Sequence, residues 1–303
     1  MELLKTLCSI EAPSGEEINL SVFLMNHIAE VKHTWKVQPE IHFGPEFQDG
    51  LMLVFGKPRT AVFAHMDSIG FTVRYNNELV KIGGPRLENG YRLRGRDRHG
   101  DVEATLLVCD DGTLKAECSR DIDRATSLTF VPSYRETEES IQCCYLDNRL
   151  GVYLALELAK TLENGIICFT TYEEHGGGNA EVMARVLHDR FQLRQALILD
   201  VTWVTEGVHA GKGTVISMRD SGIPRKPYLK RILAIADKLG VDHQIEVEGT
   251  GGSDGNSLQK SPYPFDWCFI GPAEENVHTP DEMVRKHDIQ STLLLYKGLM
   301  REL

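Results

Sequence analysis

The chain contains an apolar, β-prone run that ends in two acids and a glycine-rich turn: Ile166-Ile167-Cys168-Phe169-Thr170-Thr171-Tyr172-Glu173-Glu174-His175-Gly176-Gly177-Gly178. The run predicts a buried strand from Ile166 to Tyr172, because it is short, β-prone and bounded by turn residues. Glu173 and Glu174 then place two like charges where the strand ends. Both are ionised only near a cation or in water. On the pair alone, a solvated strand end is the simpler explanation.

The chain around this run alternates between helix-like and strand-like segments. This alternation predicts an α/β fold, with a mixed sheet flanked by helices. Strands are predicted at 51–55, 61–63, 196–200, 215–218, 244–247 and 267–270, and helices after Ser14, from Arg149, from Asn179 and over 228–239. Ser14 and Glu17 have the spacing of a capping box, which predicts Ser14 as the N-cap of the first of these helices.

The segment from about 75 to 134 has a different texture. Glycine, asparagine and aspartate interrupt it at short intervals, as in Gly83-Gly84-Pro85 and Asp110-Asp111-Gly112, and this pattern is typical of short strands joined by turns. We therefore predict a small, barrel-like β domain at 75–134. It would be inserted between a first part (1–74) and a second part (135–303) of the main α/β domain.

Composition excludes several classes of partner. The chain has 303 residues, a net charge of -11 and no basic stripe, which argues against nucleic acid or an anionic membrane as the main partner. Its seven cysteines are odd in number and lack a CxxC spacing, which fits a reducing compartment. The first residues lack the basic start of a signal peptide, and no apolar run has transmembrane length. These features predict a cytoplasmic protein.

Polar residues follow several predicted strands, at the edge where α/β sheets bind ligands. His65 and Asp67 follow one strand, Glu173 and Glu174 another, and Asp200 a third. Two more candidates lie elsewhere: Asp147 precedes the helix from Arg149, and His278 follows the strand at 267–270 and its loop. Imidazole and carboxylate groups together predict a metal site with nitrogen and oxygen ligands.

Charge favours two metal ions over one. If Asp147, Glu174 and Asp200 are ligands, their carboxylates carry a charge of -3. Two divalent ions carry a charge of +4, and the net charge of +1 would stabilise a bound hydroxide. One ion would leave the cluster at -1. Alternation along the strand predicts that Glu173 points away from Glu174. One carboxylate could then bind metal while Glu173 takes a proton from water.

Six motifs, in order along nearly the whole chain, resemble those of the two-metal aminopeptidases of the glutamyl aminopeptidase and tetrahedral aminopeptidase family. They are His65-Met66-Asp67-Ser68-Ile69-Gly70-Phe71, Leu146-Asp147-Asn148-Arg149-Leu150-Gly151, Glu173-Glu174, Asp200, Gly251-Gly252-Ser253-Asp254 and His278-Thr279-Pro280-Asp281-Glu282. The resemblance implies a zinc-aminopeptidase-like fold with an inserted β domain, and hydrolysis of the N-terminal residue of a peptide substrate.

The resemblance also implies roles for particular residues. His65 and Asp200 would bind one metal, Glu174 and His278 the other, and Asp147 would bridge them. Glu173 would be the general base. Asp67 would orient His65 rather than bind metal. Two divalent ions per subunit, zinc or cobalt, and a homo-oligomer are implied as well.

The chain departs from the family pattern after the glutamate pair. His175-Gly176-Gly177-Gly178 stands where the family has Val-Gly and a small-residue helix start. His175 is either an extra ligand or a residue that caps or packs. Residues 218–225 mix both charges, so they indicate no preferred side chain of the substrate. The inserted segment is short, so it does not establish a large tetrahedral assembly.

Several other functions fit parts of the sequence. The residues at 251–255 match a G-x-S-x-G nucleophile elbow, with Asp266 and His278 following in the order of α/β-hydrolases. Residues 207–213 resemble a phosphate loop in which the spacing is wrong. A carboxypeptidase or N-acyl amino acid deacylase of the same two-metal clan would use the same ligands. A non-catalytic relative that keeps the fold is the remaining alternative.

Overall fold

The computed structural model describes all residues from 1 to 303, and its centre is an eight-stranded mixed sheet. The strand order is β1-β2-β12-β3-β13-β17-β15-β16. The four neighbours β12, β3, β13 and β17 run parallel, while β2 and β15 are antiparallel to them. The bounds are β1 Glu40–Phe43, β2 Leu51–Phe55, β3 Ala61–His65, β12 Gly165–Thr170, β13 Gln195–Leu199, β15 Thr214–Ser217, β16 His243–Glu246 and β17 Asp266–Gly271.

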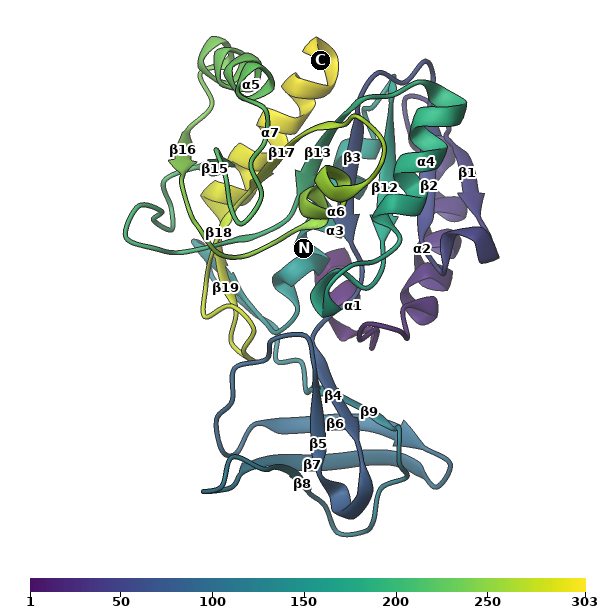
Figure 1. The fold of residues 1–303 in the computed structure, drawn as a ribbon, viewed down its shortest axis with the longest axis vertical. Helices are drawn as coiled ribbons and strands as arrows, with labels where there is room; N and C mark the ends of the chain where they lie inside the picture. The colour runs from purple at the N-terminus through teal and green to yellow at the C-terminus, as the bar shows by residue number, and fades with distance from the viewer.

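Helices cover both faces of this sheet, as predicted. Successive side chains of each strand point to opposite faces, so they enter two different hydrophobic cores. Val62 and Leu197 belong to the larger core, and Phe63 and Ile198 to the smaller one. The larger core packs against α1 (Glu2–Ser9), α2 (Ile18–Val31), α3 (Leu146–Ala159), α5 (Lys226–Leu239) and α7 (Lys286–Glu302). The smaller one packs against α4 (Ala180–Phe191) and α6 (Asp254–Lys260), on the other side in Figure 1.

A six-stranded antiparallel sheet forms a separate layer below the main sheet in Figure 1. Its order is β5-β4-β9-β6-β7-β8, and a bridge between Glu78 and Lys115 brings its two edges together into a nearly closed barrel. We propose that this layer is the inserted domain; its first strand begins at Gly70, before the predicted boundary between 1–74 and 75–134, and its last strand ends before 135–303 begins. The strands are β4 Gly70–Val73, β5 Leu79–Ile82, β6 Arg92–Asp97, β7 Gly100–Val108, β8 Leu114–Glu117 and β9 Ser127–Phe130.

A third, five-stranded sheet of very short strands was not expected from the sequence. Its order is β10-β11-β19-β18-β14. The strands are β10 Arg135–Glu136, β11 Ser140–Gln142, β14 Thr202–Trp203, β18 Ala273–Glu275 and β19 Met283–Arg285. No helix of the structure is both long enough and apolar enough to cross a membrane.

Two predictions about local structure were wrong. The strand β12 ends at Thr170 rather than Tyr172, because Tyr172 turns the chain with a left-handed φ of 63°. Glu173–His175 then forms a short 3-10 helix, so strand alternation does not separate Glu173 from Glu174. The helix α2 begins at Ile18, and Ser14 does not cap it. The Ser14 hydroxyl instead donates a hydrogen bond to Asp67 Oδ2 at 2.6 Å.

Candidate metal centre

Three neighbouring parallel strands bring their polar ends to one edge of the main sheet. His65 is the last residue of β3, which lies between β12 and β13. Glu173 and Glu174 follow β12 after a turn, and Asp200 directly follows β13. Since the carboxyl ends of parallel strands coincide, this arrangement is the one in which α/β sheets bind ligands.

Two further residues reach the same edge from outside the sheet. Asp147 lies in the irregular first turn of α3, where Tyr145 has a φ of 67°. His278 lies in the loop between β18 and β19 and has a φ of 63° itself. Left-handed backbone is uncommon for residues other than glycine, and it clusters at functional sites. Tyr145, Tyr172 and His278 therefore mark three of the segments that carry site residues.

Asp147 lies between the two imidazoles. Its Oδ1 is 3.1 Å from Nε2 of His65, and its Oδ2 is 3.3 Å from Nε2 of His278. On the first side, His65 Nε2 is 3.6 Å from Asp200 Oδ1. On the second side, His278 Nε2 is 3.2 Å from Glu174 Oε2. The centre thus consists of two histidine–carboxylate groups that share one carboxylate.

These spacings suit metal ions. Ligand atoms at zinc distances in a tetrahedral shell lie roughly 3.4 Å from one another. Ligand atoms of His65, Asp147 and Glu174 all lie within 4.8 Å of one another. The buried Oε1 of Glu174 has no hydrogen-bond partner. Burial raises the pKa of Glu174 to about 7, and Asp147 adds to this by repulsion. A cation between Glu174 and Asp147 would give the unpaired Oε1 a partner. Its attraction to both carboxylates would outweigh their mutual repulsion.

Glu173 lies beside this cluster on the His65 side. Its Oε2 is 4.0 Å from His65 Nε2. Burial raises the pKa of Glu173 well above its ordinary value, while the positive charge of His65 opposes the shift and Asp200 adds to it. A carboxylate whose pKa is raised toward neutrality is suited to accept a proton from water.

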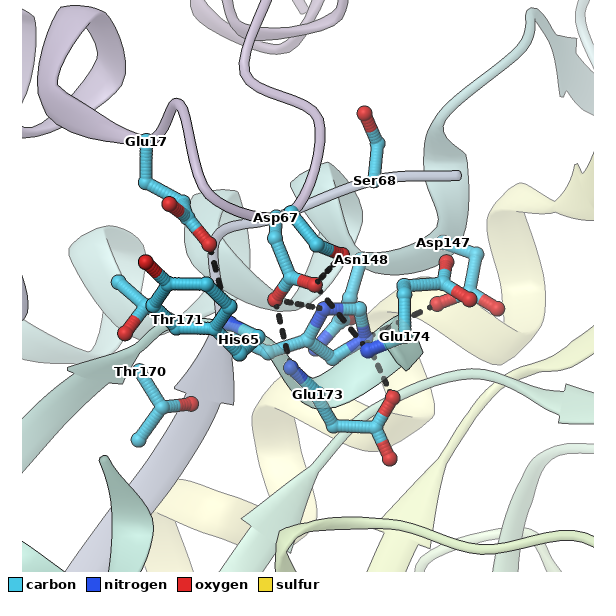
Figure 2. A network of polar contacts seen from close by, with 12 residues as sticks. Glu17, His65, Asp67, Ser68, Asp147, Asn148, Thr170, Thr171, Glu173 and Glu174 are labelled. Carbon is cyan, nitrogen blue, oxygen red and sulfur yellow. Dashed lines mark hydrogen bonds and ion pairs between the residues drawn. The ribbon is translucent and has the colours of Figure 1, made fainter. Parts of the chain in front are cut away.

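Asp67 holds the turn that carries both glutamates. Its two oxygens accept hydrogen bonds from the backbone N–H of Glu173 at 3.0 Å and of Glu174 at 3.1 Å. Figure 2 shows the contacts of this carboxylate with both glutamates and with His65 as dashed lines. Oδ1 of Asp67 is also 3.4 Å from His65 Nδ1, which is an ion-pair contact rather than a hydrogen bond. Asp67 thus contacts His65 and fixes the position of the glutamate pair.

Glu282, to which sequence reasoning assigned no role, holds the segments that carry Asp147 and His278, as Asp67 holds the turn with the two glutamates. This fully buried carboxylate accepts hydrogen bonds from the backbone N–H of His278 at 3.0 Å and of Asp147 at 3.3 Å. Its only signal in the sequence is its place four residues after His278. Glu17 was also missed: it accepts the N–H of Tyr172 at 3.0 Å, rather than completing a capping box.

The inserted sheet contacts the site through the turn between β5 and β6. His278 Nδ1 lies 3.1 Å from the carbonyl oxygen of Gly84, which leaves Nε2 free to bind a metal. The N–H of Gly83 donates to Nδ1 of His175 at 3.0 Å. The His175 ring therefore contacts this turn, and it is not among the groups that meet at Asp147.

Two alternatives from the sequence are not supported. Ser253 has an extended backbone with a φ of -165° and caps α6 by accepting the N–H of Gly255, so it lacks the strained turn of a nucleophile elbow. Asp266 pairs with Arg225 at the start of β17. In the glycine-rich segment 207–213, the carboxylate of Asp288 already accepts the amides of Gly211 and Gly213 at 2.7 Å.

Known proteins resemble this chain in overall sequence and in fold. A lysyl aminopeptidase of Pyrococcus furiosus is 23% identical over 81% of this chain and 82% of its own. An aminopeptidase from the archaeon Desulfurococcus kamchatkensis has a TM-score of 0.85 at 20% identity, covering 100% of this chain and 94% of that one. The TET1 peptidase of Pyrococcus horikoshii has a TM-score of 0.81 at 22% identity, covering 100% and 99%.

The match to a protein family is more specific than these likenesses. The model of the M42 glutamyl aminopeptidase family matches residues 90–295, which is more than half of the chain. The matched segment includes Asp147, Glu173, Glu174, Asp200 and His278. With the fold and this match in agreement, the chain belongs to the M42 glutamyl aminopeptidase family.

Proposed function

We propose that this protein is a metallo-aminopeptidase that removes the N-terminal residue of peptides at a centre of two divalent ions. The observation that carries the proposal is the position of Asp147, whose two oxygens face His65 and His278 at 3.1 and 3.3 Å. A carboxylate shared in this way is what two ions about 3.5–4 Å apart require.

Each proposed ion has its own ligands besides the shared carboxylate. His65 and Asp200 would hold the first ion, and Glu174 and His278 the second. Three carboxylates and two neutral imidazoles are a donor set that zinc and cobalt accept, and we propose one of these two metals. Asp67 and Glu282 would keep the ligand-bearing segments in register through their backbone N–H groups.

Glu173 would move the proton during hydrolysis. When bound, the two ions would polarise the scissile carbonyl and favour ionisation of water at the centre. The carboxylate of Glu173 would accept the proton of the attacking water and deliver it to the amine as the peptide bond breaks. Desolvation raises the pKa of Glu173 although the charge of His65 opposes the shift, and a raised pKa suits a general base.

The family match favours an aminopeptidase over other enzymes that would use the same metal ligands. A carboxypeptidase or N-acyl amino acid deacylase of the same clan would need a similar centre, but the M42 model describes glutamyl aminopeptidases. The substrate is therefore a peptide with a free N-terminus.

Location and assembly are part of the same proposal. All seven cysteines are free, which fits the cytoplasm. We also propose a homo-oligomer, since the similar TET1 peptidase of Pyrococcus horikoshii is described as assembling into a tetrahedron or a large octahedral shell. Light scattering coupled to size exclusion would give the mass in solution. A mass equal to one chain would contradict an oligomer.

The function is tested with a panel of aminoacyl p-nitroanilides. Protein loaded with zinc or cobalt should hydrolyse at least one of them, lose the activity in a chelator and regain it when metal returns. N-acylated versions of the same substrates should not be cleaved. Bound metal without hydrolysis of any substrate would support a non-catalytic relative instead.

A further inference from the structure

A cleft of about 270 Å³ opens beside the metal-binding residues. Asp147, Glu173, Glu174, Asp200 and His278 are among the residues that line it. Its other lining residues, which the proposed chemistry does not use, include Val201, Trp203, Asp220, Glu246, Glu248 and Phe269.

Three of these other lining residues are carboxylates, and no lysine or arginine lines the cleft. Asp220 is 7% exposed and Glu246 is 4% exposed, so both are removed from bulk water. None of Asp220, Glu246 and Glu248 forms a salt bridge within 4.0 Å. A buried carboxylate without a cation is costly, and a bound cation would remove much of that cost.

The partners of these carboxylates are neutral and few. Asp220 Oδ1 accepts the N–H of Gly222 at 2.6 Å, and Glu246 Oε1 accepts the hydroxyl of Thr202. No hydrogen bond of the structure involves the carboxylate of Glu248. The nearby Arg219 is turned to the backbone, because its Nε donates to the carbonyls of Asp220 and Glu248.

The apolar residues of the cleft complete its shape. Phe269 and Trp203 line it together with Val201. An aliphatic stem would contact these side chains, while a charged tip would reach the carboxylates. An amphipathic cation therefore fits the lining better than a purely apolar or an anionic side chain.

We propose that this cleft receives the side chain of the substrate's N-terminal residue and selects lysine or arginine, with Asp220, Glu246 and Glu248 as the specificity-determining carboxylates. This inference rests on the proposed aminopeptidase function and deepens it. The same cleft would disfavour an N-terminal glutamate, because its carboxylate would meet three others.

The test separates the side-chain charge from the α-amino group, which every substrate carries. Zinc- or cobalt-loaded protein is assayed with the p-nitroanilides of lysine, arginine, norleucine, leucine and glutamate. Norleucine has an unbranched stem like that of lysine but lacks the ammonium group. The value of kcat/KM should be about 10- to 100-fold higher for lysine than for norleucine, as expected for a charge-assisted contact.

Variants then locate the selectivity. Glu248→Gln and Asp220→Asn should each lower the lysine-to-norleucine ratio of kcat/KM several-fold. Glu181→Gln, at an exposed position in the first turn of α4, is the matched control and should leave the ratio unchanged.

The outcomes distinguish the inference from the function on which it rests. Cleavage of norleucine or leucine as fast as lysine would overturn the proposed selectivity and leave the aminopeptidase function intact. A lysine preference that survives in both variants would overturn the assignment to these carboxylates. No cleavage of any substrate by metal-loaded protein would refute the proposed function and the inference together.

Discussion

Two buried carboxylates hold the site at the scale of single residues. Asp67 accepts the backbone N–H groups of Glu173 and Glu174, and Glu282 accepts those of Asp147 and His278. Each carboxylate thus joins two groups that must keep their relative positions. These backbone hydrogen bonds orient the segments that carry the site residues.

The first prediction concerns the proposed base. Glu173→Gln keeps the size of the side chain but cannot accept a proton, so kcat should fall by roughly 10²- to 10⁴-fold. Metal content should stay at the wild-type value, because Glu173 is not among the proposed ligands. Turnover assays and elemental analysis of the same sample check this. Loss of metal along with turnover would contradict the separation of base from ligands.

The second prediction concerns Glu282. A glutamine at this position offers one acceptor oxygen in place of two, so one of the two N–H groups loses its partner. Metal affinity should then fall about 10- to 100-fold, as for other residues that orient ligands. Competition with a fluorescent zinc chelator measures it, with Glu181→Gln as control. An unchanged affinity would show that the two segments keep their places without Glu282.

The third prediction concerns pH. Burial raises the pKa of Asp220 to about 6, and Glu246 adds to this, while the N–H of Gly222 and the charge of Arg219 oppose it. Below that pH the carboxyl is neutral while a lysine substrate stays cationic. The lysine-to-norleucine ratio of kcat/KM should therefore decrease as pH falls from 8 to 5. Both substrates use the same metal centre, so any effect of pH on that centre cancels in the ratio. A flat ratio would exclude Asp220.

At the scale of elements, the sequence predicted the long strands and helices well because their patterns are local. The strand at 51–55 was predicted with its observed bounds, and helices near 149, 179 and 228 are present. The end of β12 was misplaced because Tyr172 takes a left-handed turn that its residue type does not favour. The five-stranded sheet was missed because strands of two or three residues carry no periodicity.

The backbone of Asp200 packs closely against the end of a neighbouring strand. A Cβ on Gly271, at the end of β17, would lie 1.5 Å from the carbonyl oxygen of Asp200. Gly271→Ala should therefore force the backbone of Asp200 to move and destabilise the fold by roughly 3 kcal/mol. Urea unfolding measures the loss. Gly207→Ala, where a Cβ meets nothing within 4 Å, is the control. Equal stability of the two variants would contradict this packing.

At the scale of the whole molecule, the site lies where the three sheets meet. His65 belongs to the main sheet, His278 to a loop of the five-stranded sheet, and the carbonyl of Gly84 to a turn of the inserted sheet. Seven residues with proposed roles, Asp67 among them, were singled out from their places next to predicted elements. Glu282 and Glu17 were not, because their function depends on contacts between distant segments that no local pattern encodes.

We propose that Asp147 joins two divalent ions in one aminopeptidase centre. The most direct measurement is a titration of metal-free protein with zinc or cobalt, in which bound metal and hydrolysis of an aminoacyl p-nitroanilide are followed together. We predict that activity rises until two ions are bound per chain, and that Asp147→Ala binds neither tightly. Full activity with one ion per chain, or two tightly bound ions in Asp147→Ala, would contradict the claim.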